Sequence, residues 1–193
     1  MMMKQVSMLA AAVVLSLGTA ASAATISWGD GSSPGDNLDP SSMTGAVLVD
    51  ATTSILNVSL SPFDGSAIPN AEFNSVGADA TATYVFSSLR TSLSMIWGSV
   101  DTYNFIDFYN GVTLLGTFNG AAAGPIFTSN RALTAILATI GGFGQFDSVV
   151  LRSPGANAFE HASVAAVPVP AAGFLLIGAL GGLAALRRRR KTA

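Results

Sequence analysis

Acidic side chains near the N-terminus are the first residues whose type and spacing could do chemistry. Asp30, Asp36 and Asp39 lie within ten residues of one another, in a stretch rich in Gly, Pro and Asn. Calcium takes oxygen ligands from clustered carboxylates, so these three residues are a candidate calcium site. Their spacing does not match an EF-hand loop, and loops of this composition also occur without an ion. A second candidate ion site surrounds Asp101, beside the turn that follows Trp97.

Hydrolytic catalysis would require a nucleophile with a base, or a pair of carboxylates. The single histidine, His161, falls in a predicted last strand, where we expect a surface or edge position. A glycosidase would need two facing carboxylates, and Asp101 and Asp107 with Glu160 or Glu72 could supply them. Nothing in the sequence brings any of these pairs together. The chain has no cysteine, which excludes thiolate chemistry and disulfides. We therefore expect no enzymatic activity.

Aromatic side chains could instead bind a sugar by stacking against its ring. Trp97, Tyr103 and Tyr109 lie in a segment rich in aromatic residues and are the candidates for such a platform. Aromatic residues in strands also bury large apolar areas in protein cores. Both interpretations remain open for these three residues.

The charges are segregated along the chain. Lys4 lies near the N-terminus and residues 187–191 are all basic, which leaves Arg90, Arg131 and Arg152 as the basic residues between them. The same central part contains all eleven acidic residues. Its net charge is therefore −8, although the whole chain carries −2. An acidic domain repels phosphate backbones, which excludes nucleic acid as a partner.

The N-terminus has the three parts of a secretory signal peptide, predicted here as residues 1–23. Lys4 supplies the positive charge, and residues 9–17 form an apolar stretch too short to span a bilayer comfortably. A small-x-small cleavage site follows. The residues around the predicted cut are Ala21, Ala23 and Ala24.

The C-terminus is a predicted membrane segment. Residues 171–186 carry no charge, and as a helix they would reach about 24 Å, against about 30 Å for the bilayer core. Thinning of the bilayer and snorkelling of the flanking arginines can close this gap. A basic cluster at residues 187–193 should remain cytoplasmic, which places the acidic domain outside the inner membrane. The cluster consists of Arg187, Arg188, Arg189, Arg190 and Lys191.

A short linker, residues 164–170, precedes this segment and carries a Pro-containing motif. The motif consists of Val167, Pro168, Val169, Pro170 and Ala171. Together with the apolar run and the terminal arginines, it resembles the VPLPA variant of PEP-CTERM sorting domains, with Val169 in place of the usual leucine. The resemblance covers about 27 residues. It implies that an exosortase-type membrane protease is a partner, which cuts near the motif and delivers the protein to the cell surface or the extracellular matrix.

The central residues 24–163 form one predicted all-β domain. Short stretches rich in β-branched and aromatic residues recur between turns, including 55–60, 81–89, 91–98 and 146–151. The dipeptide Asn110-Gly111 between two such stretches predicts a hairpin with a type I′ turn. The pattern indicates an antiparallel β-sandwich of jelly-roll type.

Three motifs of this domain resemble a group of exosortase-dependent bacterial surface proteins. They are Trp97-Gly98-Ser99-Val100-Asp101-Thr102-Tyr103-Asn104, Phe108-Tyr109-Asn110-Gly111 and Ala158-Phe159-Glu160. The last motif departs from the pattern of the group after Glu160. The resemblance implies a jelly-roll-like fold and carries no catalytic activity. We expect a non-enzymatic protein of the surface or extracellular matrix; the alternative is a carbohydrate-binding module for extracellular polysaccharide.

Overall fold

The computed structural model describes residues 24–30, 38–64, 66–123 and 136–168. Within these ranges the protein is all-β, and its one helical element is the short 3-10 turn η1 (Gly120–Ala123). No helix in the described part of the chain has the length and apolar character to cross a bilayer. The predicted signal peptide, the predicted span 171–186, the basic cluster and Val169, Pro170 and Ala171 of the motif lie outside the described residues.

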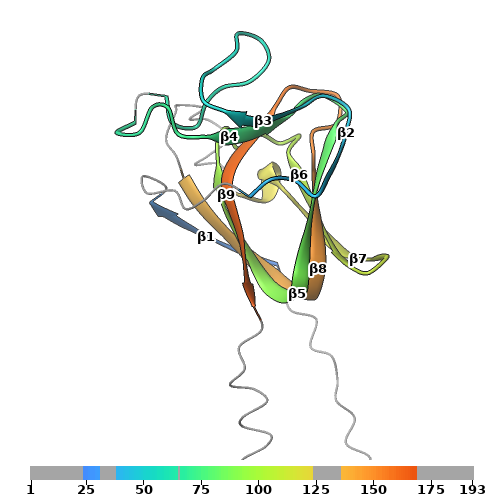
Figure 1. Cartoon of the computed structure of the whole chain (residues 1–193). Helices are drawn as coiled ribbons and strands as arrows, with labels where there is room; N and C mark the ends of the chain where they lie inside the picture. Colours follow the sequence, from blue (N-terminus) through green and yellow to red (C-terminus); the bar gives the residue numbers. More distant parts are fainter. Residues whose placement is uncertain (1–23, 31–37, 65, 124–135, 169–193) are drawn as a thin grey trace, which may run out of the picture.

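In the described ranges, nine strands form one antiparallel sheet (Figure 1). Its main path runs β3-β4-β9-β5-β8-β6-β7, with β1 added to β8 and β2 added to β5. The strands are β1 (Thr25–Asp30), β2 (Ser42–Thr44), β3 (Val47–Ala51), β4 (Phe73–Val76), β5 (Thr81–Trp97), β6 (Phe105–Asn110), β7 (Thr113–Asn119), β8 (Ile136–Arg152) and β9 (Phe159–Pro168).

Two long strands, β5 and β8, bend the sheet. Each has 17 residues, and they pair with each other on both sides of a register break between Val85 and Ser92. At this break β8 contains Gly142 and Gly144, which have positive φ angles that favour glycine. The predicted separate strands 81–89 and 91–98 are therefore one strand, because the chain bends here while remaining paired.

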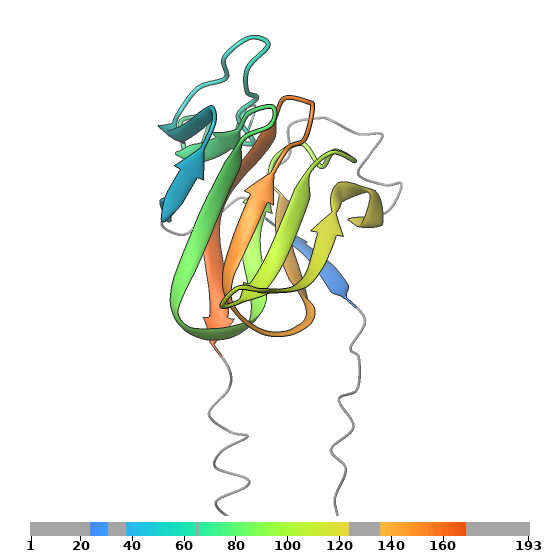
Figure 2. The same ribbon diagram turned by 90° about the vertical axis from the view of Figure 1, so that its right-hand side faces the viewer.

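The bend folds the sheet into two facing layers. Layer A contains β7, β6, the second half of β8, the first half of β5 and β2; Figure 2 shows the first four of these side by side. Layer B contains β1, the first half of β8, the second half of β5, β9, β4 and β3. One apolar core fills the space between them, with Ile106 and Phe108 from layer A against Leu93 and Met95 from layer B.

The loop between β3 and β4 (residues 52–72) covers the outer face of layer B. Its Phe63 forms a second apolar cluster with Phe73, Ile96 and Ala162. The predicted strand 55–60 is wrong, because Ile55 and Ser59 form only an isolated bridge around a turn. Alternating apolar residues need a neighbouring strand to pair with, and this loop offers none.

The predicted hairpin at Asn110-Gly111 is confirmed, but its predicted type I′ turn is wrong. Asn110 pairs with Thr113, so Gly111 and Val112 form the two-residue loop. Of these two loop residues, Gly111 has a positive φ, 56°, and Val112 does not. A glycine with positive φ at the first loop position is the pattern of a type II′ turn.

The first and last described strands reach the same end of the molecule. Thr25 of β1 pairs with Gly141, Gly141 pairs with Ser92, and Ser92 pairs with Val167 of β9. We call this the terminal end; it also contains the bends of β5 and β8, at the bottom of Figure 1. The predicted linker at residues 164–168 is instead the last part of β9, because β5 extends far enough to pair with it.

Candidate functional site

A pocket of about 490 Å³ opens at the other end of the two layers, which we call the pocket end. Here β5 ends at Trp97, which pairs with His161 near the start of β9. Along β9, His161 lies about 20 Å from Val167 at the terminal end, at roughly 3.4 Å per residue. The pocket is lined by residues 54–60 together with Ser99, Asp101, Tyr103, Asn157, Ala158 and Glu160.

Asn104 joins two of the motifs at the base of this pocket. Its side-chain oxygen accepts hydrogen bonds from Trp97 Nε1 at 3.1 Å and from the backbone N–H of Asp101 at 3.0 Å. Its side-chain nitrogen donates to the carbonyl oxygen of Ala158 at 3.2 Å. The Trp97 ring also stacks on Phe159, with 5.1 Å between centroids. The segments 97–104 and 158–160, far apart in sequence, therefore form one packed unit.

Trp97 cannot act as a sugar-stacking platform; of the two interpretations left open for this residue, the core position is the one observed. Its side chain is fully buried and belongs to the core between the layers. A large apolar ring gains more by burial here than by exposure, and Asn104 satisfies its only polar atom. Trp97 supports the pocket from below instead of lining it.

Glu160 ties the 52–72 loop to the turn after β5. It is only 2% exposed, and its carboxylate accepts hydrogen bonds from the backbone N–H of Leu60 and the hydroxyl of Ser99, both at 2.8 Å. Burial raises the pKa of this carboxyl group, and the two hydrogen bonds oppose that rise. Glu160 therefore shapes one wall of the pocket.

Tyr103 and Asp101 form a second part of the wall. The half-buried Tyr103 places its hydroxyl 2.7 Å from Asp101 Oδ2 and 3.0 Å from the carbonyl oxygen of Asn157. These contacts fix the orientation of the tyrosine ring. Of the four predicted catalytic carboxylates, the structure brings Asp101 and Glu160 to the same pocket, and both take part in hydrogen bonds that hold its shape.

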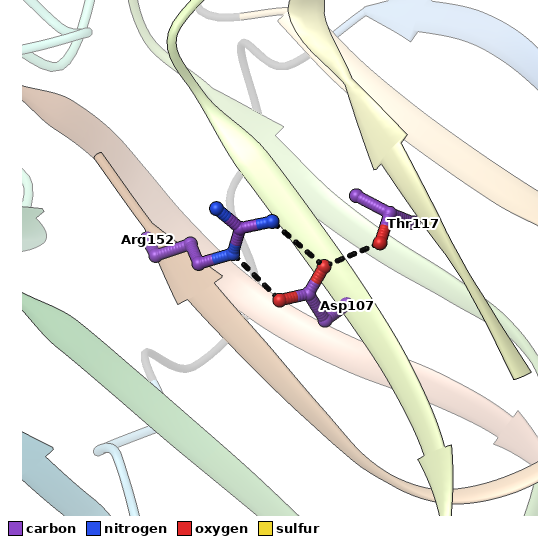
Figure 3. A network of polar contacts seen from close by, with 3 residues as sticks. All are labelled: Asp107, Thr117 and Arg152. Carbon is purple, nitrogen blue, oxygen red and sulfur yellow. Dashed lines mark hydrogen bonds and ion pairs between the residues drawn. The ribbon is translucent and has the colours of Figure 1, made fainter. Parts of the chain in front are cut away.

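Asp107 belongs to a different network, in layer A (Figure 3). Its carboxylate accepts from Arg152 Nε at 2.6 Å and Nη2 at 3.3 Å, and from the Thr117 hydroxyl at 2.6 Å. The Arg152 guanidinium also lies over the Phe105 ring, 4.5 Å from its centroid. The ion pair links β6 to β8, and the Thr117 hydrogen bond adds β7, so Asp107 has a structural role away from the pocket. Glu72 is exposed and does not line the pocket either.

The remaining predicted site residues are not gathered at the pocket. Tyr109 is half-buried near the hairpin turn at the terminal end, so it cannot share a sugar platform with Tyr103. Asp39 is exposed, while Asp36 and the side chain of Asp30 lie outside the described residues. Among the residues that the structure describes, no three His, Asp or Glu side chains are grouped to hold a metal ion. The calcium site at Asp30, Asp36 and Asp39 stays a prediction.

His161 is fully buried, so its predicted surface or edge position is wrong. Strand β9 lies between β4 and β5, which makes it an inner strand of layer B. His161 Nε2 lies 2.6 Å from the Tyr84 hydroxyl, and Asn74 Nδ2 donates to the same hydroxyl at 3.1 Å. Burial lowers the pKa of His161 to about 4, so the ring is neutral. Its Nε2 accepts a hydrogen bond from the Tyr84 hydroxyl. This network connects the two layers.

The hydrogen-bonding roles of Asn104 and Glu160 were missed by the sequence reasoning. The available signal was the presence of polar residues beside the aromatic residues in the two motifs 97–104 and 158–160. A scan against protein-family models finds no match, and neither the curated proteins nor the solved structures contain a match to this chain. The fold and the site therefore define the class: an all-β domain of one antiparallel sheet with a pocket at one end.

Proposed function

We propose that this chain is a non-enzymatic exported protein of the cell surface or extracellular matrix, sorted through its C-terminal tail. An exosortase-type membrane protease is its processing partner, and the inner membrane holds it in transit. Its domain, residues 24–168, is a sandwich of jelly-roll type. The segregated charge supports this proposal, because a domain of net charge −8 lies between the basic ends.

The position of the described chain ends carries the proposal. β1 begins and β9 ends in one row of layer B, so the predicted signal peptide and the predicted span 171–186 would both adjoin the domain at its terminal end. β9 ends at Pro168, three residues before the predicted span begins at Ala171. An anchored domain would then stand on the membrane with its pocket pointing away from it.

Intact-mass measurement of the protein in the surface fraction tests the proposal. We expect a species that lacks residues 1–23 and the cluster 187–191. The substitution Pro170→Ala in the motif should leave the tail attached, whereas Pro154→Ala, at an exposed turn, should be processed normally. A surface protein of full C-terminal mass would overturn the sorting proposal.

The carbohydrate-binding alternative depends on the pocket and not on the tail. Only Tyr103 of the three predicted aromatic residues lines this pocket. Its ring is nevertheless held in a fixed orientation beside Asp101, as a sugar-binding wall requires.

A further inference from the structure

We propose that the pocket binds a unit of a neutral glycan chain, which extends the proposed function from delivery to recognition. The pocket combines one aromatic ring, two carboxylates and three serines with an apolar rim. Its volume of about 490 Å³ lies within the range of about 300–1,000 Å³ typical of ligand sites.

Ser59 is the first observation that points to a ligand. It lines the pocket and is 7% exposed, and its hydroxyl has no hydrogen-bond partner among the residues that the structure describes. Leaving a buried hydroxyl unpaired costs about 1–3 kcal/mol, so natural structures usually pair such groups with protein, water or ligand. A hydroxyl can both donate and accept, and sugar hydroxyls offer both kinds of partner.

The carboxylates provide further acceptors for sugar hydroxyls. Each ionised carboxylate has about four lone-pair sites, and the two protein hydrogen bonds to Glu160 occupy only part of this capacity. Asp101 lines the same wall, and its Oδ2 contact with Tyr103 keeps the aromatic ring in place. The acceptors are therefore pre-organised before a ligand arrives, which reduces the entropic cost of binding.

Apolar side chains at the rim suit the C–H face of a sugar ring. Leu56 is 88% exposed, and Ile55 and Val58 beside it are also exposed. These residues lie on the loop that Glu160 holds through Leu60, and they line the same pocket as Tyr103. A glycan unit could pack between this apolar loop and the tyrosine ring while its hydroxyls reach the acidic wall.

The charge of the pocket selects neutral ligands over acidic ones. None of the described residues that line it is basic. Of the two arginines in the described part of the domain, Arg152 pairs with Asp107 in layer A and Arg90 lies over Phe86 at the bend of β5. Uronic, sulfated or phosphorylated sugars would meet Asp101 and Glu160 without a compensating cation.

Titration of the full chain, purified in a detergent without a sugar headgroup, tests this inference. The probes are neutral glucan, galactan and mannan oligosaccharides, with polygalacturonate as the acidic comparison. Calorimetry measures binding, and tryptophan fluorescence gives a second signal because the ring of Trp97 lies below the pocket. We expect at least one neutral probe to bind saturably and to bind equally in the presence of a calcium chelator.

Variants distinguish the pocket from the rest of the surface. Ser59→Ala should weaken the affinity by about tenfold without lowering the stability, because it removes a hydroxyl that lacks a partner in the described part of the chain. Tyr103→Phe should also weaken binding while retaining the ring, and Ser88→Ala, in the exposed bend of β5, should bind normally.

Three results would overturn the inference: no neutral probe binds, Ser59→Ala and Tyr103→Phe bind as tightly as the natural sequence, or polygalacturonate binds best. Loss of binding on removal of calcium would also overturn it, because the ligand would then be held through an ion. The processing experiment on Pro170 is independent of all four results.

Discussion

Protonation of the buried histidine should destabilise this domain in mild acid. His161 is neutral in the folded state. Its Nε2 accepts a hydrogen bond from the Tyr84 hydroxyl, and its Nδ1 lies 3.2 Å from the Phe159 carbonyl oxygen. Burial lowers its pKa from 6.5 to about 4. Between these two values the unfolded chain binds a proton that the folded domain does not, so acid favours unfolding.

The size of the effect follows from the difference in pKa. One pKa unit corresponds to about 1.4 kcal/mol, so a shift from 6.5 to about 4 gives a loss of about 3 kcal/mol by pH 4. The stability contributed by neutral His161 is fully present above pH 6.5 and is lost as the pH falls toward 4. Glu160 acts in the opposite sense, because its raised pKa favours the folded state at low pH.

Urea unfolding at pH 7.0 and pH 4.5 measures this loss, with His161→Gln as the matched variant. Glutamine can still accept from Tyr84 but does not titrate, and Glu160 is present in both proteins, so its contribution cancels. We expect the natural sequence to lose about 2 kcal/mol more than the variant over this interval. Equal losses in the two proteins would refute the reasoning.

Nuclear magnetic resonance provides a direct check, because the chain contains a single histidine. In protein purified without a histidine tag, the imidazole signals should not shift between pH 7 and pH 5. A midpoint near pH 6.5 in the folded protein would contradict the buried network.

Three further substitutions test the packing, each by its shift in the urea midpoint. Asp107→Asn should cost about 1 kcal/mol, a value kept small because Arg152 is 33% exposed, and the loss should shrink if the ion pair is screened by salt. Gly120→Ala should cost more than about 2 kcal/mol, because a Cβ there would lie 1.9 Å from the Asp101 carbonyl oxygen. Trp97→Ala should cost about 3–5 kcal/mol, as expected for a fully buried aromatic residue; little change would show that Trp97 is not in the core.

The two motifs around the pocket illustrate how a sequence pattern can be recognised without its role being known. Trp97 and Tyr103 are both aromatic and lie six residues apart, and the sequence pattern allows the same two interpretations for each, a core residue or a sugar platform. In the structure Trp97 is buried below the pocket, while Tyr103 is half-buried and lines it. The side of the turn that each ring occupies depends on Asn104 and on its contact with Ala158, and on the stacking of Trp97 on Phe159. Ala158 and Phe159 lie more than fifty residues later in the sequence.

The amino-acid sequence by itself determined the local features of this protein. Alternating β-branched and aromatic residues predicted an all-β domain, and Asn110-Gly111 predicted the position of the hairpin, because both depend on neighbours within a few residues. The placement of charge along the chain likewise follows from the order of the residues alone and predicts an exported acidic domain between basic ends.

Only the tertiary structure decided which strands pair and which side chains are buried. Three features depend on residues distant in sequence. They are the pairing of β5 with β8 on both sides of the bend, the inner position of His161, and the hydrogen bond between Glu160 and Leu60. A strand has the same alternating pattern whether one or both of its edges are paired, so the pattern could not show that β9 lies between β4 and β5. That non-local pairing buries His161 and forms the pocket.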